Sequence, residues 1–263
     1  MYGALAGDIA GSIYEFNNIK TKEFNLYVEP RLRFTDDSVM TIAVAKSLWD
    51  TMEDNYEGLN ESLIKNMHEI GKRYPYCGYG NRFYNWIMFD GTKPYYSYGN
   101  GSAMRVSECG WVGNSLNEVL KLADITASVT HNHPEGIKGA QAIAACIYLA
   151  RNDWTKEDIR KYVEENFYDM DFKLDDIRNS YKFEVSCQKS VPQAIESFLE
   201  SFSFDDALKN AISIGGDSDT LAAMAGSIAE AYYGVPDRVK LFVNSRLDKY
   251  LLDIIKRRVN DEQ

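Results

Sequence analysis

Two short acidic segments, near opposite ends of the chain, combine carboxylates with hydroxyl groups. The first is Thr35-Asp36-Asp37-Ser38, and the second is Gly215-Gly216-Asp217-Ser218-Asp219-Thr220. Carboxylate and hydroxyl oxygens are the hard ligands that Mg²⁺ and Mn²⁺ prefer, and each segment leads directly into an apolar stretch with helical spacing. If the two segments meet in the fold, they make a metal site.

The second segment carries the sharper signal. Its two glycines permit a tight approach into a helix, and Asp217, Asp219 and Thr220 then place three oxygen ligands within one turn. The first segment alone is also explained by an ordinary helix N-cap, because Asp36 and Asp37 suit the positive end of the helix dipole.

A third polar set interrupts the glycine-rich apolar stretch at the start of the chain. Asp8, Ser12 and Glu15 are spaced so that they follow one face of a helix. Such side chains are costly to bury without a purpose, although an exposed helix end would also explain them. We expect Glu15 to face the metals as an acid or base, or to position water, with Asp8 supporting the site.

The spacing of apolar residues predicts helices along most of the chain, and no alternating run is long enough to suggest a sheet. We therefore expect an all-α fold, built as a single domain over residues 1–263. Residues 167–189 lack a helical period and are expected to form a long surface excursion. The predicted helices cover residues 2–14, 38–50, 59–72, 116–126, 135–151, 156–166, 190–200, 204–212, 220–233 and 236–259.

Three of these predicted helices are rich in small residues, which let helix axes approach closely. We expect them to form the centre of the bundle. The small residues are Gly3, Gly7 and Gly11 in the first, Gly136, Ala140 and Ala144 in the second, and Ala222, Ala223, Ala225, Gly226 and Ala229 in the third.

The net charge argues against nucleic acid as a partner. The 263 residues carry a formal charge of −10, whereas a nucleic-acid binder normally shows a basic face. The basic cluster Lys256-Arg257-Arg258 is expected to be an exposed helix end, where cations suit the dipole.

Cysteine usage and hydropathy favour a cytoplasmic protein. Cys77, Cys109, Cys146 and Cys187 are widely spaced and form no CxxC pair, which predicts reduced thiols rather than zinc or disulfides. No basic leader precedes the first apolar residues, and the longest apolar run, residues 142–150, is too short to span a bilayer. No membrane association is expected, and a monomer is the simplest state.

Taken together in order, these motifs resemble those of the ADP-ribosylglycohydrolases. The resemblance implies an all-α orthogonal helix bundle with a binuclear Mg²⁺ centre, for which Mn²⁺ is a substitute. It also implies hydrolysis of the N- or O-glycosidic bond between ADP-ribose and an acceptor, either a protein side chain or a small ADP-ribosyl compound. The segments that carry it are Gly7-Asp8-Ile9-Ala10-Gly11-Ser12-Ile13-Tyr14-Glu15, Phe34-Thr35-Asp36-Asp37-Ser38, Gly99-Asn100-Gly101-Ser102-Ala103-Met104-Arg105, Thr130-His131, Ser190-Val191-Pro192 and Gly215-Gly216-Asp217-Ser218-Asp219-Thr220.

The resemblance also assigns residues to the site. The metal ligands that it implies are Thr35, Asp36, Asp37, Asp217, Asp219 and Thr220. The ligand loop that it implies is Ser97, Tyr98, Gly99, Asn100 and Gly101, with His131 lining the ADP-ribose cleft. Glycines of such a loop expose N–H groups to a diphosphate and an aromatic ring can stack on adenine, but an ordinary turn would have the same composition. Tyr79 and Gly80 are expected to add a second piece of that wall.

Catalysis is expected to depend on Glu15, Asp36, Asp37 and Asp217, with metals that hold the ribose hydroxyls and orient a water. Two other classes of function remain open. A Mg²⁺-dependent phosphoester hydrolase would use the same carboxylates but cleave phosphate esters or the pyrophosphate. A non-catalytic ADP-ribose-binding protein would need only the ligand loop, and the presence of every metal-ligand position argues against it.

Overall fold

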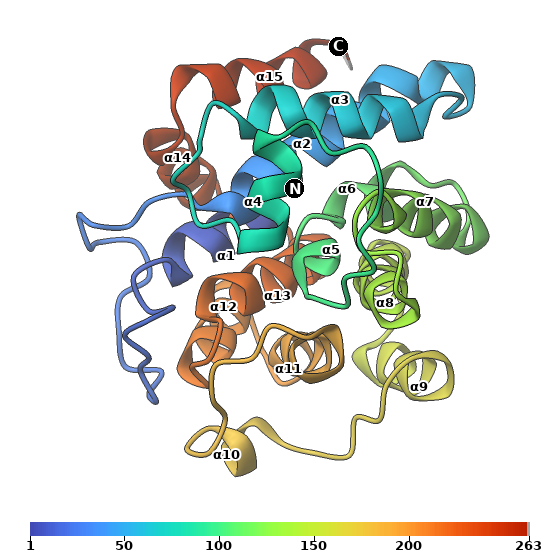
Figure 1. Cartoon of the computed structure of the whole chain (residues 1–263). Coiled ribbons are helices and arrows are strands. Elements are labelled where there is room, and N and C mark those ends of the chain that lie inside the picture. The colour runs from blue at the N-terminus through green and yellow to red at the C-terminus, as the bar shows by residue number, and fades with distance from the viewer. Residues whose placement is uncertain (262–263) are drawn as a thin grey trace.

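The chain folds into helices joined by loops (Figure 1). The computed structural model describes residues 1–261, with side chains through residue 256, and this part contains no strand. The predicted all-α fold is therefore confirmed. The elements are α1 (Tyr2–Gly11), α2 (Asp36–Thr51), the 3₁₀ turn η1 (Met52–Asp54), α3 (Leu59–Gly71), α4 (Asn81–Met88), α5 (Gly101–Met104), α6 (Ser107–Val112), α7 (Leu116–Ser128), α8 (Pro134–Arg151), α9 (Lys156–Asn166), α10 (Leu174–Ile177), α11 (Cys187–Leu199), α12 (Phe204–Ser213), α13 (Ser218–Tyr233), α14 (Asp237–Arg246) and α15 (Lys249–Asp261).

Helices α1 and α13 lie side by side in the interior, although they come from opposite ends of the chain (Figure 1). Their contact is made by small residues. A Cβ added to Gly7 would lie 2.0 Å from the carbonyl oxygen of Ala222, and one added to Gly11 would lie 2.4 Å from the Cα of Asp219. The small residues therefore bring the backbone of α1 against the start of α13, as their spacing predicts.

The remaining helices surround this pair. Helix α8 contacts α13, α11, α6 and α7, and α2 packs between α1 and α3. One continuous cluster of buried apolar side chains includes residues of elements from α1 to α15. The acidic segments lie at the N-terminal ends of α2 and α13, so the core fixes both of them.

Four short helices, α4, α5, α6 and α10, were not anticipated from the sequence. Helix α4 buries Phe83, Trp86 and Ile87, which are spaced at i, i+3 and i+4, but two turns are too short to stand out as a periodic pattern. Helices α5 and α6 have four and six residues. Residues of α4 and α5, with the loop between them, line one part of the site cavity.

Two predicted boundaries were wrong. The helix expected over residues 236–259 is divided, because Leu247 is extended and the carboxylate of Asp248 accepts a hydrogen bond from Leu251 N at 3.0 Å, which starts α15. The excursion expected over residues 167–189 contains α10 and the first turn of α11. Met170 and Leu174 within it are buried, so this segment is partly core.

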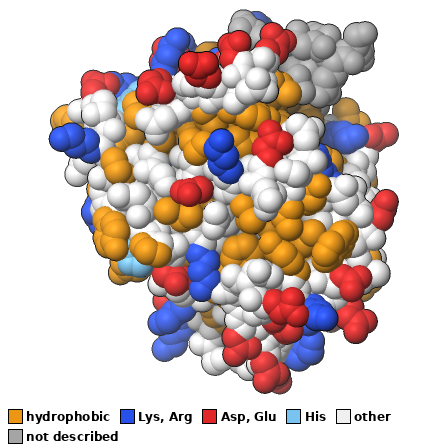
Figure 2. Space-filling model, turned by 90° about the vertical axis from the view of Figure 1, so that its right-hand side faces the viewer, with side chains coloured by type: hydrophobic (Ala, Val, Ile, Leu, Met, Phe, Trp, Pro, Cys, Tyr) orange, Lys and Arg blue, Asp and Glu red, His pale blue; other side chains and the backbone are white. Residues whose placement is uncertain are grey.

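The molecular surface mixes charges of both signs. Figure 2 shows acidic and basic side chains interspersed with hydrophobic ones on the face to which α3, α7 and α9 contribute. All four cysteines are free. None of the described helices has the length and apolar character that crossing a bilayer requires. The side chains of Arg257 and Arg258 lie outside the described residues, so the expectation for the basic cluster stays a prediction.

Candidate functional site

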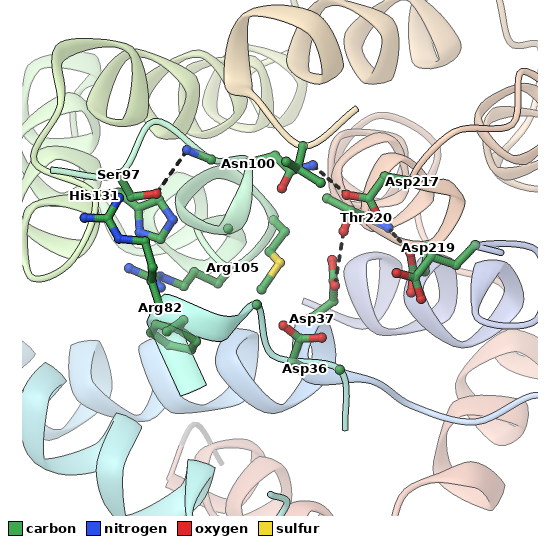
Figure 3. Close-up of a pocket in the computed structure, with 18 of the residues that line it drawn as sticks. Asp36, Asp37, Arg82, Ser97, Asn100, Arg105, His131, Asp217, Asp219 and Thr220 are labelled. Carbon is green, nitrogen blue, oxygen red and sulfur yellow. Dashed lines mark hydrogen bonds between the residues drawn. The ribbon is translucent and has the colours of Figure 1, made fainter. Parts of the chain in front are cut away.

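The two acidic segments meet at the floor of one cavity (Figure 3). Thr220 Oγ1 donates a hydrogen bond to Asp37 Oδ2 at 3.2 Å. Carboxylate oxygens of Asp8, Asp37 and Asp219 lie within 4.8 Å of one another, and so do those of Glu15, Asp217 and Asp219. Asp219 belongs to both groups, so the acidic side chains form two adjoining clusters.

Local backbone geometry brings each segment to a helix N-terminus. Thr35 is the N-cap of α2, and its hydroxyl accepts the N–H of Asp37 at 3.4 Å. Before α13, Gly215 and Gly216 have φ values of 71° and 76°, which side chains rarely tolerate. This glycine turn reverses the chain, so that Asp217 and Asp219 face the first segment at the positive ends of two helix dipoles.

The carboxylate of Asp8 holds the first acidic segment in place through hydrogen bonds. Its carboxylate accepts hydrogen bonds from Thr35 N at 2.9 Å, Thr35 Oγ1 at 2.6 Å and Ser38 N at 3.1 Å, and also from the Ser38 hydroxyl. The side chain of Thr35 is thus directed at Asp8, and Thr35 does not line the cavity, whereas Asp36 and Asp37 do.

Glu15 reaches the cavity from a turn rather than from a helix face. Helix α1 ends at Gly11, so the continuous stripe expected for Asp8, Ser12 and Glu15 is not formed. Asn18 instead fixes this turn: its amide donates to Glu15 O at 3.0 Å and to Gly216 O at 2.9 Å, and Gly216 N donates back to its oxygen at 2.8 Å. Asn18 therefore ties the Glu15 turn to the second acidic segment.

Burial raises the pKa of every carboxyl in this group. The pKa values of Asp36, Asp37 and Asp219 lie well above the usual range, first through burial and then through repulsion from neighbouring carboxylates. The pKa of Glu15 is raised to about 7 by burial, with repulsion from Asp217 and Asp8 adding to it. Such a cluster favours protons, or cations, over open negative charge.

The donor set fits a divalent cation. Asp37 Oδ1 is buried and has no hydrogen-bond partner, and none of these carboxylates forms an ion pair with Lys or Arg in the described part of the chain. Buried oxygens that face one another without a positive partner are the ligands that Mg²⁺ binds. The residues present can therefore hold a metal ion.

The cavity above the carboxylates has a volume of about 510 Å³. Ser97, Gly99, Asn100, Gly101 and His131 all line it, as expected for the ligand loop. Asn100 Nδ2 donates to Asp217 Oδ2 at 2.8 Å, which ties this loop to the acidic floor.

Of the other residues expected in the wall of the cavity, only Gly80 lines it, and Tyr98 and Tyr79 do not. The side chain of Tyr98 is about half exposed outside the cavity, and its ring lies 5.3 Å from that of His133. Gly80 lines the cavity, but Tyr79 is buried and donates to the carbonyl of Gly71.

A segment without a predicted role closes one side of the cavity. Asn100 N donates to Val185 O at 2.8 Å, and Cys187 N donates to Tyr98 O at 2.9 Å, so the segment before α11 pairs with the ligand loop. Phe183 from this segment stacks on Phe16, which follows Glu15, at a centroid distance of 5.9 Å. The two rings lie at the mouth of the cavity beside Glu15.

Two arginines also line the cavity. Arg105 is fully buried and donates to Thr126 O and Thr130 Oγ1, whereas Arg82 is exposed at the rim, over the ring of Tyr95. Arg105 ends the motif Gly99-Asn100-Gly101-Ser102-Ala103-Met104-Arg105, which is a signal that could have identified it, whereas Arg82 lies on the unanticipated helix α4 and has no such signal.

Comparisons with known proteins agree with this architecture. A profile of the ADP-ribosylglycohydrolase family matches residues 1–259. ADP-ribosylhydrolase ARH3 of Gallus gallus is 27% identical, with 88% of this chain and 83% of the relative aligned, and ADP-ribosylarginine hydrolase Tri1 of Pseudomonas putida is 24% identical, with 89% and 70% aligned. A solved structure titled ADP-ribosylglycohydrolase-related protein complex superposes with a TM-score of 0.66 at 18% identity, over 96% of this chain and 93% of that chain, and shares the fold. The chain belongs to the ADP-ribosylglycohydrolase family.

Proposed function

We propose that this protein is a metal-dependent hydrolase that cleaves the glycosidic bond between ADP-ribose and an acceptor and releases free ADP-ribose. Membership of the family supports activity on ADP-ribose linkages. The observation that carries the proposal is the hydrogen bond from Asn100 to Asp217, because it joins the ligand loop and the acidic floor in one cavity. A ligand held by the loop would have its ribose over the carboxylates.

The proposed cofactor is a pair of Mg²⁺ ions, for which Mn²⁺ can substitute. Support comes from the two adjoining carboxylate clusters and from the unpartnered Asp37 Oδ1. When bound, the ions supply positive charge that stabilises developing negative charge and activates water. The residues proposed to hold them are Asp36, Asp37, Asp217, Asp219 and Thr220, together with Thr35, whose hydroxyl donates to Asp8 in this structure.

Glu15 is the proposed acid or base. In the metal-free protein its pKa is raised to about 7, first by burial and then by repulsion from Asp217 and Asp8, so this carboxyl can carry a proton in the pH range where an acid or base acts. Asn18 holds its backbone against Gly216, so the carboxyl stays beside Asp217 and at the mouth of the cavity. Asp36, Asp37 and Asp217 complete the proposed catalytic set through the metals.

The acceptor is proposed to leave through the mouth beside the stacked rings of Phe16 and Phe183, next to Glu15. These rings are 79% and 50% exposed, so they offer an apolar surface to whatever ADP-ribose is attached to. The acceptor is either a protein side chain or a small ADP-ribosyl compound.

The test is detection of free ADP-ribose by chromatography. The protein is incubated with arginine-linked, serine-linked and O-acetyl-linked ADP-ribose, each with Mg²⁺ and with chelator. Metal-dependent release from one of them identifies the linkage. Release of AMP would instead indicate a phosphoester hydrolase, and tight ADP-ribose binding without release from any substrate would indicate a binding protein.

A further inference from the structure

A chain of buried hydrogen bonds runs from Arg105 to the imidazole of His131. Arg105 Nη2 donates to Thr130 Oγ1 at 2.8 Å, and Thr130 Oγ1 lies 2.8 Å from His131 Nδ1. The three residues are 1%, 0% and 5% exposed, so water does not replace these bonds. Figure 3 shows Arg105 and His131 on the side of the cavity that also holds Ser97 and Arg82.

The donors and acceptors around Thr130 Oγ1 determine which ring nitrogen of His131 carries the hydrogen. A guanidinium only donates, so Arg105 occupies a lone pair of Thr130 Oγ1. Apart from Arg105 and His131, no described residue bonds to this hydroxyl. If His131 Nδ1 carried the hydrogen, the buried hydroxyl hydrogen of Thr130 would have no acceptor, which is unfavourable. Thr130 therefore donates to Nδ1, and the ring hydrogen is on Nε2.

The imidazole of His131 is neutral near pH 7, so it has a single N–H. Burial lowers the pKa of His131 well below its usual value, and the positive charges of Arg105 and Arg82 lower it further. A neutral imidazole has one N–H, and its hydrogen-bonding role is then set by the tautomer alone.

His131 Nε2 points at the glycines of the ligand loop. A Cβ added to Gly101 would lie 3.1 Å from this atom, and one added to Gly99 would lie 3.6 Å from it. No described residue accepts a hydrogen bond from Nε2, and all three residues line the cavity. Because Gly99 and Gly101 have no side chains, there is room beside the Nε2–H of His131 for an acceptor atom of a ligand.

We propose that Arg105 and Thr130 are positioning residues that hold His131 as its Nε2–H tautomer, so that His131 donates a hydrogen bond to a phosphate oxygen of ADP-ribose at Gly99 and Gly101. The inference rests on the proposed function for the identity of the ligand. An anion suits this position because neither Arg105 nor Arg82 has a carboxylate partner among the described residues. The tautomer of His131 then selects an oxygen acceptor over a donor group.

The first test reads the tautomer without ligand or metal. Long-range ¹H–¹⁵N spectra of the chelator-treated protein should show His131 with an unprotonated Nδ1 and a protonated Nε2. His133 is an internal reference, because its Nδ1 accepts the N–H of Glu135 at 3.0 Å and has the same tautomer. The variant His131→Gln identifies the resonances of His131.

Variants of Thr130 then test the positioning role. Thr130→Val removes the hydroxyl and should give a mixed or reversed tautomer, whereas Thr130→Ser keeps it and should match the wild type. Thr126→Val is the matched control, because Arg105 also bonds to the backbone oxygen of Thr126, and the buried hydroxyl that this variant removes bonds to Ala123 O and Cys109 Sγ and not to a histidine. A wild-type Nδ1–H tautomer, or an unchanged tautomer in Thr130→Val, would overturn the proposal.

The second test measures ADP-ribose affinity by calorimetry in Mg²⁺. Thr130→Val should bind roughly two- to tenfold more weakly, because only part of the protein carries the competent tautomer and one hydrogen bond is weakened. Thr130→Ser and Thr126→Val should bind like the wild type. Equal affinity of Thr130→Val and wild type would overturn the donor role. Failure of the wild type to bind ADP-ribose at all would refute the proposed function instead, and the ligand-free spectra would still decide the tautomer.

Discussion

Thr220 and Asp37 are 183 residues apart in the sequence, and the hydroxyl of Thr220 donates a hydrogen bond to Asp37 Oδ2 at 3.2 Å. This bond joins the N-terminal turns of α13 and α2. It leaves Asp37 Oδ1 buried without a partner, while Asp219, one residue before Thr220, directs its carboxylate at the same space. Two ends of the chain thus bring together carboxyl groups that repel one another when ionised, and a bound cation would offset that repulsion.

Removing one of these charges should abolish metal binding without harming the fold. In Asp219→Asn we expect Mg²⁺ binding to be lost and ADP-ribose release to fall by more than about 100-fold, the upper end of what losing an outer-shell partner costs. The metal-free variant should be at least as stable as the metal-free wild type, because repulsion with Asp37 and Asp217 is reduced. Calorimetric Mg²⁺ titration and thermal unfolding in chelator measure the two effects.

Asp237→Asn is the control for that variant, since Asp237 is an exposed acid on α14. It should leave Mg²⁺ binding and activity unchanged. Wild-type activity in Asp219→Asn would show that the carboxylate clusters are not a metal site.

The metal-free protein should lose stability as pH rises. The pKa values of Asp36, Asp37 and Asp219 are raised in the folded state, and that of Glu15 is raised to about 7, so the folded chain keeps protons that the unfolded chain has released. The free energy of unfolding in chelator should therefore decrease from about pH 4, near the unfolded values, upward through neutral pH.

Mg²⁺ should reverse this trend, because it competes with protons for the same oxygens. The stabilisation by Mg²⁺ should be small at about pH 5 and grow toward pH 8. Urea unfolding across this range, with Mg²⁺ and with chelator, gives both curves, and Asp219→Asn should show a shallower slope in chelator. A metal-free protein that becomes more stable between these pH values would contradict the pKa shifts.

The all-α fold and the second acidic segment could be predicted because each has a strong local signal, whereas the ligand loop was expected only from the resemblance to the family. Gly215 and Gly216 mark the turn before Asp217, and the four-residue spacing of Gly7 and Gly11 marks the contact between α1 and α13. These features depend on residues close together in the sequence.

The rest of the site depends on tertiary contacts, which leave little local trace. Phe183 stacks on Phe16 only because the segment before α11 pairs with the ligand loop. Arg82 reaches the rim from a helix of two turns, too short for a periodic pattern to stand out. The resemblance assigns Tyr98 to the ligand loop, and its ring packs on His133, about half exposed and outside the cavity.

Asn18 should control catalysis from outside the cavity. It bonds to the backbone of both Glu15 and Gly216, so Asn18→Ala should free the Glu15 turn from the second acidic segment. We expect kcat to fall by about 10- to 100-fold, as for other residues that orient functional groups, with little change in the melting temperature because Asn18 is exposed. Steady-state kinetics measure the fall in kcat, and ADP-ribose affinity shows whether ligand binding has changed as well.

Asn17→Ala is the matched control, because this neighbouring exposed side chain makes no hydrogen bond in the described structure. If Asn18→Ala and Asn17→Ala have equal kcat values, Asn18 does not position Glu15.

Gly11 should link the core to the site, because it is where α1 touches the first turn of α13. A Cβ at this position would lie 2.4 Å from Asp219 Cα and 2.7 Å from Asp219 N, which are backbone atoms that cannot rotate away. Gly11→Ala should therefore separate the two helices at a cost of about 1–3 kcal/mol in the free energy of unfolding. It should also weaken Mg²⁺ binding, because Asp219 moves with the backbone. Gly80→Ala is the stability control, since a Cβ there would meet no atom within 4 Å and its φ of −59° suits alanine. Urea unfolding and Mg²⁺ titration of both variants decide the matter: if Gly11→Ala matches the wild type in both measurements, the close approach of α1 does not set the position of Asp219.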